Sequence, residues 1–229
     1  MKRFLLFFFF ILLFFSSNLL GHAQHYNKIS YLEYDLFLNN KIIGSHKFQF
    51  KKKGDLLYVY SNCVFNVKKL GIDIMNYEGK TEEIYKKNQL LTFNSKTKQN
   101  NKDKFVKLNF NEDKLNYQID GSSYNGETDL ESVIGSWWNH EIVTKNRQIS
   151  PISGRIMPQK VKFLGKEKIK INDIDYNALH FHFYSNDDKP FEKKKLNIHI
   201  WYDENTMLWL KSSYEKLGNW EYRLKKAEF

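Results

Sequence analysis

The sequence is poor in the residues that build disulfide frameworks, metal modules and familiar catalytic motifs. It holds a single cysteine, Cys63, in 229 residues. One cysteine excludes an internal disulfide framework and a cysteine-rich zinc module. The sequence also lacks a G-x-S-x-G motif, a glycine-rich phosphate loop and an H-E-x-x-H motif. We therefore expect no cofactor and favour a protein that is not an enzyme.

Arginine is scarce, although the chain is basic. The net charge is +10 at pH 7, yet 32 of the 36 basic residues are lysines. Proteins that read nucleic acids favour the planar guanidinium of arginine, whereas lysines at strand edges keep a sheet soluble. Clusters such as Lys51-Lys52-Lys53 and Lys193-Lys194-Lys195 stand beside turn signals. We expect a solvated face, with an anionic membrane surface as the alternative and no nucleic acid as a partner.

The long apolar run in the sequence is confined to its beginning. Residues 1–23 start with Lys2-Arg3, continue with an apolar run from Phe4 to Phe15 and end in small residues. This is the pattern of a secretory signal peptide. The run is shorter than the roughly 20 residues needed to span a bilayer as a helix. We predict cleavage before Gln24 and export to the periplasm or the cell exterior, with a retained anchor as the alternative.

The remaining chain, residues 24–229, has the composition of one globular domain. The sequence is 41% hydrophobic and 17% aromatic, which excludes a disordered chain. Loss of the leader removes two positive charges and no acidic residue, so the net charge of +10 falls to +8. No linker, repeat or change of composition marks a boundary. We expect a single domain and a monomer.

Strands dominate the predicted secondary structure. In Ser30–Leu38, apolar side chains recur at every second residue, which is typical of a strand with one buried face. Asn39-Asn40 then favours a tight hairpin into a return strand, Ile42–Phe50. Similar runs and turn signals continue to the end of the chain. The fold class is therefore mainly β, with about a dozen strands in a single curved antiparallel sheet that forms a barrel or half-barrel.

One short helix is predicted near residues 128–140. Thr128-Asp129-Leu130-Glu131 has the spacing of a capping box, in which the threonine and the glutamate satisfy each other's backbone amides. Gly135 is a natural end for such a helix. We expect it to cover the open side of the sheet or one rim.

The tryptophan pair that follows this helix gives the first candidate site. Trp137, Trp138 and His140 lie close together in the sequence, and adjacent indoles cannot share one face of a strand or helix. One indole is therefore expected in the core and the other at a rim. Together with Trp201, these residues are candidates for binding an apolar ligand. The alternative is a structural plug that closes the end of the barrel.

Three histidines give the second candidate site. His180 and His182 point the same way on one predicted strand, and His199 falls opposite His182 on the next. Three imidazoles on two strands can hold zinc, which would indicate a metal-binding protein or a metal-dependent enzyme. The alternative is that they are outward-facing polar residues that alternate with apolar core residues.

The nature of the interior separates the remaining hypotheses. The leading one is a protein that binds a lipid-like ligand or an envelope partner on its concave face. The alternative is a structural envelope protein with a filled interior. The two differ in whether a cavity remains between the residues expected to face inward, which are Leu36, Phe48, Phe50, Phe65, Phe181, Phe183, Ile198 and Ile200.

Two further side chains have expected environments. Cys63 has no partner for a disulfide, so in an exported chain we expect it to be buried in the core. Glu83 lies near Glu78 and Glu82, and the three carboxylates are expected to be solvated.

The order of several short motifs resembles a family of exported bacterial β-proteins known as a domain of unknown function. The motifs are Gly44-x-His46-x-Phe48-x-Phe50, Trp138-Asn139, Trp201-Tyr202-Asp203 and Trp220-x-Tyr222-x-Leu224. The resemblance covers nearly all of residues 24–229. It implies a curved antiparallel sheet similar to the half-barrels that carry lipoproteins across the periplasm. It implies no catalytic residues.

Overall fold

The computed structural model describes residues 28–190 and 193–229, so the predicted signal peptide and cleavage junction lie outside the described residues. Strands make up most of the described chain, which confirms the predicted fold class. The elements are β1 (Tyr31–Leu38), β2 (Lys41–Lys53), β3 (Leu56–Lys69), β4 (Ile72–Lys86), β5 (Gln89–Gln99), β6 (Lys102–Asn111), β7 (Asn116–Gly121), β8 (Tyr124–Asp129), β9 (Ser132–Ile134), the 3-10 helix η2 (His140–Thr144), β10 (Arg147–Ile149), β11 (Ile156–Ile171), β12 (Ile174–Ser185), β13 (Asn197–Asp203), β14 (Trp209–Glu215) and β15 (Asn219–Glu228). In this part of the chain no helix is long and apolar enough to cross a membrane.

All the described strands belong to one 15-stranded sheet. Its order is β8-β7-β6-β5-β4-β3-β2-β1-β15-β14-β13-β12-β11-β10-β9. The ladders are antiparallel, as predicted, except the short β9–β10 pair, which is parallel. The first strand begins as the sequence predicts, with Leu32, Tyr34 and Leu36 buried on one face. Asn39 and Asn40 both adopt positive φ angles in the hairpin that follows.

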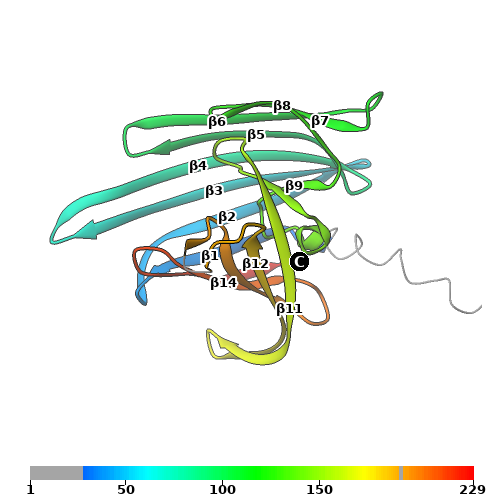
Figure 1. Ribbon diagram of the computed structural model, residues 1–229. Coiled ribbons are helices and arrows are strands. Elements are labelled where there is room, and N and C mark those ends of the chain that lie inside the picture. The colour runs from blue at the N-terminus through cyan, green and yellow to red at the C-terminus, as the bar shows by residue number, and fades with distance from the viewer. Residues whose placement is uncertain (1–27, 191–192) are drawn as a thin grey trace, which may run out of the picture.

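The two edges of the sheet meet, so that the sheet curves into a nearly closed barrel (Figure 1). β8 and β9 lie at opposite ends of the strand order, yet only two residues of the chain separate them. Polar contacts support this link. The hydroxyls of Thr128 and Ser132 lie 2.7 Å apart, and Arg147 forms an ion pair with Asp129. A sheet joined at its edges in this way must curve through most of a full turn.

The prediction of a helix that starts at Thr128 is wrong. Thr128 lies in β8, which ends at Asp129, and the backbone N–H of Glu131 donates to the carboxylate of Asp129 at 3.0 Å. The segment therefore forms a turn and not a capping box. The chain must reach the opposite edge of the sheet within two residues, which a helix cannot do. A short 3-10 helix, η2, does form later, and the amide of its second residue, Glu141, donates to the side chain of Asn139 at 3.0 Å.

The turns between strands lie at two ends of the barrel. Because neighbouring strands are antiparallel, successive turns alternate between the ends. We call one the mouth end, since the cavity described below opens there; its turns are residues 39–40, 70–71, 100–101, the connection between β12 and β13, and residues 216–218. The opposite end carries residues 54–55, 87–88, 112–115, 172–173 and 204–208, together with the start of β1 and the end of β15.

The core fills the half of the barrel away from the mouth. The segment between β9 and β11 crosses this region, where Trp138, Ile142 and Ile149 are almost fully buried. Phe50, Phe93 and other inward-facing side chains pack against them in one continuous cluster. This packing closes one end of the barrel and leaves the other end hollow.

Candidate functional site

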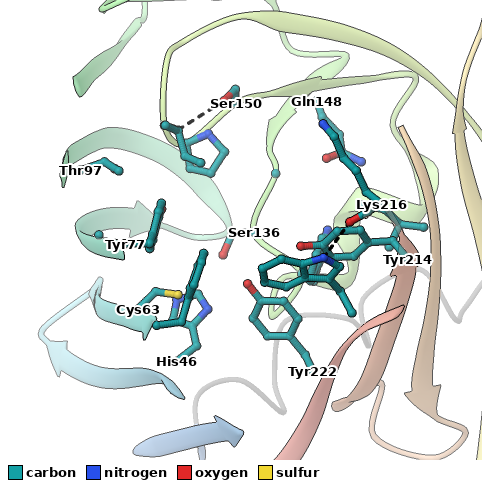
Figure 2. Close-up of a pocket in the computed structure, with 18 of the residues that line it drawn as sticks. His46, Cys63, Tyr77, Thr97, Ser136, Gln148, Ser150, Tyr214, Lys216 and Tyr222 are labelled. Carbon is teal, nitrogen blue, oxygen red and sulfur yellow. Dashed lines mark hydrogen bonds between the residues drawn. The ribbon is translucent and has the colours of Figure 1, made fainter. Parts of the chain in front are cut away.

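A cavity of about 780 Å³ occupies the mouth half of the barrel. Its size lies in the range of sites that hold a small organic ligand. Figure 2 shows His46, Cys63 and Tyr77 on one side of it and Tyr214 and Lys216 on the other. Of the side chains predicted to face inward, Phe48, Phe65 and Ile198 line it. The interior of the barrel is therefore not filled.

Small side chains create the space along the wall made by β3, β4 and β5. Cys63 pairs across the ladder with Gly79, and Gly79 pairs with Thr97. One step deeper, Ser61 pairs with Thr81, and their hydroxyls lie 2.7 Å apart. All five residues line the cavity. The inward positions of three adjacent strands thus hold little volume at the same level, and a barrel of this many strands is too wide for them to fill.

Aromatic side chains form the facing wall. The ring centroid of Trp137 lies 5.3 Å from that of Trp209 and 5.3 Å from that of Tyr222. Nearer the mouth, Tyr214 stacks on Trp220 at 5.7 Å. These large rings support one another in edge-to-face and stacked contacts, so the wall is rigid and apolar.

Three polar atoms in this region are buried without a hydrogen-bond partner among the described residues. They are Nδ1 of His46, Nε1 of Trp137 and Nε1 of Trp209, and all three side chains line the cavity. Burial lowers the pKa of His46 to about 3, so the imidazole is neutral at pH 7. An unpaired buried polar group costs about 1–3 kcal/mol. A ligand with a polar group would relieve that cost.

Glu83 lies at the floor of the cavity, which corrects the expectation that it is solvated. The side chain is 1% exposed. The hydroxyl of Tyr85 donates to one carboxylate oxygen at 2.6 Å, and the indole N–H of Trp138 donates to the other at 3.2 Å. Burial raises the pKa of Glu83 to about 7, against the opposing effect of these donors. The carboxyl group therefore changes protonation near neutral pH.

The two tryptophans lie in different places, one in the core as predicted and the other in the wall of the cavity instead of at a rim. Trp137 lines the cavity, whereas Trp138 lies beneath its floor and packs edge-on against Phe50 and Tyr85. His140 is buried at the start of η2 and is not among the lining residues. Trp201 lies on another face of the sheet, stacked on His180 with ring centroids 4.2 Å apart. Of the four predicted ligand-binding residues, the cavity therefore includes Trp137.

The three histidines are brought together as predicted, away from the cavity. His182 pairs with His199 across the ladder, and their rings stack at 4.4 Å. Nε2 of His180 lies 2.8 Å from Nδ1 of His199, and Nδ1 of His180 lies 2.9 Å from the carboxylate of Glu167. Burial lowers the pKa of His180, and that of His199 to about 4. Within residues 28–190 and 193–229 no group of three or more side chains has the arrangement of a metal site, and metal binding stays a prediction.

Comparison with known proteins identifies the family. Residues 34–225 match the profile of a domain of unknown function, DUF6134. The chain belongs to this family. This confirms the resemblance inferred from the motifs, and four of the motif residues, His46, Phe48, Trp220 and Tyr222, line the cavity. Among proteins with curated functions, none matches the chain.

The DUF6134 fold also resembles that of a solved structure. This is the crystal structure of a beta-barrel-like protein of the domain of unknown function DUF1849 from Brucella abortus. The two share 9% sequence identity, with a TM-score of 0.60 over 88% of this chain and 97% of that chain. Identity this low shows a shared fold.

Sequence reasoning missed most of the cavity wall of this DUF6134 protein. A signal was present, because Ser61, Cys63, Gly79, Thr81 and Thr97 are small residues at alternate positions of β3, β4 and β5, although Gly79, Thr81 and Thr97 lie beyond the ends of the strands predicted from the sequence. Each strand alone looks unremarkable. The space arises because the register places the small side chains side by side.

Proposed function

We propose that the chain is an exported protein that binds an apolar, lipid-like ligand inside its barrel. The observation that carries the proposal is the cavity of about 780 Å³ with one aromatic wall and one wall of small side chains. Cavities of this kind hold ligands whose bodies are mainly apolar and whose few polar groups meet fixed partners. The hollow interior weighs against a purely structural protein with a filled barrel.

The unpaired atoms at the cavity add a polar group to the proposed ligand. Trp137 and Trp209 offer indole N–H donors, and the neutral imidazole of His46 can donate or accept. These atoms are buried, so a carbonyl, ester or carboxyl group on an otherwise apolar molecule would pair with them only after the side chains turn towards the cavity. The ligand class is therefore an acyl-type molecule with an oxygen acceptor at one end.

The proposal that the protein is exported rests on its first 23 residues. Their basic start, apolar run and small-residue end have the order of a cleaved signal peptide. A carrier of apolar molecules is useful in an aqueous compartment between membranes, where such molecules do not dissolve. Mass spectrometry of the protein isolated from exporting cells would give the mature N-terminus, which we expect at Gln24.

Ligand binding can be tested by filling the cavity. The probe is N-phenyl-1-naphthylamine, a neutral apolar dye that fluoresces in apolar sites. Cys63→Phe places a ring in the cavity, whereas Asn62→Phe adds the same ring on the exposed face of the same strand. We expect the first variant to weaken dye binding at least about tenfold and the second to leave it unchanged.

A second pair of variants guards against misfolding. Thr97→Phe fills the cavity from β5, and Lys96→Phe is its exposed counterpart. Thermal unfolding of each variant shows whether the barrel is intact. If the folded cavity-filling variants bind the dye as tightly as the unchanged protein, or if the unchanged protein shows no saturable binding, the proposed function is wrong.

A further inference from the structure

Large apolar side chains stand exposed around the mouth of the cavity. Leu70 is 94% exposed at the tip of the β3–β4 hairpin and Leu217 is 99% exposed at the tip of the β14–β15 hairpin. Ile72, Ile42 and Ile74 are 69%, 64% and 53% exposed at the same end of the barrel. We call these five side chains the mouth rim. Exposed apolar groups gathered at one place indicate a surface that another phase or molecule covers.

The mouth rim is continuous with the cavity. Ile74 and Leu217 belong to both, since they line the cavity and are exposed to solvent. Leu38 and Met75 line the cavity beside them. In Figure 1 the β3–β4 hairpin extends beyond the neighbouring turns on the left, which is the mouth end. An apolar ligand could thus pass between the interior and whatever covers the rim without entering water.

The two ends of the barrel carry opposite charge. The mouth-end segments, residues 39–42, 68–74, 98–104, 186–190, 193–196 and 215–218, contain eleven lysines and five acidic residues. The segments at the opposite end, residues 28–31, 53–56, 86–89, 111–115, 172–174, 203–207 and 226–229, contain six lysines and seven acidic residues. Positive charge is therefore concentrated at the end that carries the mouth rim.

Three of the five mouth-rim side chains are preceded directly by a lysine in the sequence. The pairs are Lys41-Ile42, Lys69-Leu70 and Lys216-Leu217. A lysine beside an apolar side chain suits the boundary of a bilayer, where the apolar group enters the acyl region and the ammonium group stays with the phosphates. The three side chains belong to separate hairpins around an opening, so they offer no continuous groove for a peptide. A fluid bilayer accepts insertion at several separate points.

We propose that the mouth end docks on an anionic phospholipid bilayer, with the mouth rim inserted among the lipids and the lysines against their headgroups. This inference rests on the proposed function, because docking would place the cavity directly against the source or the destination of a lipid-like ligand. The lysines at this end, expected from the sequence to be mainly solvated, would then face the phosphates of the lipid headgroups. The interaction weakens with salt, since exposed charges are screened.

The test uses flotation with phospholipid vesicles. Residues 24–229 contain the whole described fold, and a tag after Phe229 lies away from the mouth because the end of β15 pairs with the start of β1. Vesicles of phosphatidylcholine with 30% phosphatidylglycerol should bind the protein, and pure phosphatidylcholine vesicles should bind it much less. The double variant Leu70→Asn/Ile72→Thr should lose at least about tenfold in affinity. Asparagine suits the positive φ of Leu70, so the hairpin should still form.

A matched control lies at the opposite end. Leu115 is 62% exposed, has a positive φ and follows a lysine, just as Leu70 does. Leu115→Asn should leave vesicle binding unchanged. Equal loss in this control and in the double variant, or equal binding to both kinds of vesicle, would overturn the proposal. Failure of the unchanged protein to float with anionic vesicles would also overturn it and would leave the rim as a surface for a protein partner.

The same variants separate this inference from the proposed function. Neither Leu70 nor Ile72 lines the cavity, so the double variant should bind N-phenyl-1-naphthylamine as the unchanged protein does. Vesicle binding without dye binding would mean that docking stands and the ligand proposal is wrong. Dye binding together with failed vesicle binding would mean the reverse.

Discussion

Glu83 is an acidic side chain in the wall of an apolar cavity, and its surroundings oppose its charge. It is 1% exposed, and its oxygens accept from Tyr85 and Trp138. The donors stabilise the carboxylate, but burial has the larger effect and raises the pKa to about 7.

The substitution Glu83→Gln tests this placement. The native state holds the Glu83 proton more tightly than the unfolded state does, because the folded pKa of about 7 exceeds the ordinary 4.5. The free energy of unfolding should therefore fall, by about 3 kcal/mol at most, as the pH rises from 4.5 through 7. Urea denaturation at several pH values should show a flatter profile in Glu83→Gln.

The outward-facing neighbour supplies the control for that experiment. Glu82→Gln changes the same functional group on the same strand but on the other face of the sheet. Its profile should match that of the unchanged protein. A Glu83→Gln profile as steep as that of the unchanged protein would contradict the buried carboxyl group.

Single residues were predictable where burial follows from alternation alone. Cys63 is buried at 6% exposure, as the lack of a disulfide partner predicts, and burial raises the pKa of its thiol to about 12. Glu83 has the same alternation as its apolar neighbours Val59 and Phe93, with which it shares a row across the sheet. The charge of Glu83 predicted exposure to solvent, but the pairing of β3, β4 and β5 places its side chain on the buried face of the sheet.

At the scale of elements, the β2–β3 ladder shows how closely two strands approach at one position. Gly44 pairs with Phe65, and a Cβ atom on Gly44 would lie 2.0 Å from the carbonyl oxygen of Val64 and 2.6 Å from Cα of Phe65. Backbone atoms cannot yield to such contacts without moving the strand. The glycine of the Gly44-x-His46 motif is therefore a requirement of the ladder that positions His46 in the cavity.

Gly44→Ala should destabilise the protein by about 2–3 kcal/mol, because the added methyl group must push β2 away from β3. Chemical denaturation measures the change, and Ser45→Ala on the same strand is the control. Dye binding by the folded fraction should also weaken, since His46 moves with β2. A Gly44→Ala variant as stable as Ser45→Ala would mean that the strands do not approach this closely.

Among the elements, hairpins were more predictable than the closure of the barrel. Asn39-Asn40 indicates its own turn, because both residues tolerate positive φ. The segment Thr128–Glu131 carries an equally good local signal for a helix, and that signal fails. The pairing of β9 with β10 at the far edge of the sheet requires a short connection without a helix here. The local sequence pattern carries no information about this long-range pairing.

The whole molecule is one continuous sheet around one core, and the tryptophans allow its cooperativity to be measured. All five tryptophans lie between residues 137 and 220, whereas the single cysteine lies in β3. Tryptophan fluorescence therefore reports on the second half of the barrel, and thiol reactivity of Cys63 reports on the first.

We expect the two signals to change at the same urea concentration, because the sheet and its core run through both halves without a boundary. Far-UV circular dichroism should follow the same curve. Two separate transitions would show that residues 24–229 form two folding units and would contradict the single domain predicted from the composition.

The strand order takes the chain almost all the way around the nearly closed barrel. Every ladder joins strands that are consecutive in sequence, except β1 with β15, and the one consecutive pair without a ladder is β8 and β9. If the two termini were joined and the chain were opened between Leu130 and Glu131, the order of the strands along the sequence would be the same as their order across the sheet. The natural chain instead leaves its single distant pairing, Tyr31–Leu38 with Trp220–Glu228, to join the two halves of the meander. Formation of the β1–β15 ladder closes the longest loop in the chain and therefore has the largest entropy cost of any ladder. We expect this ladder to form late in folding.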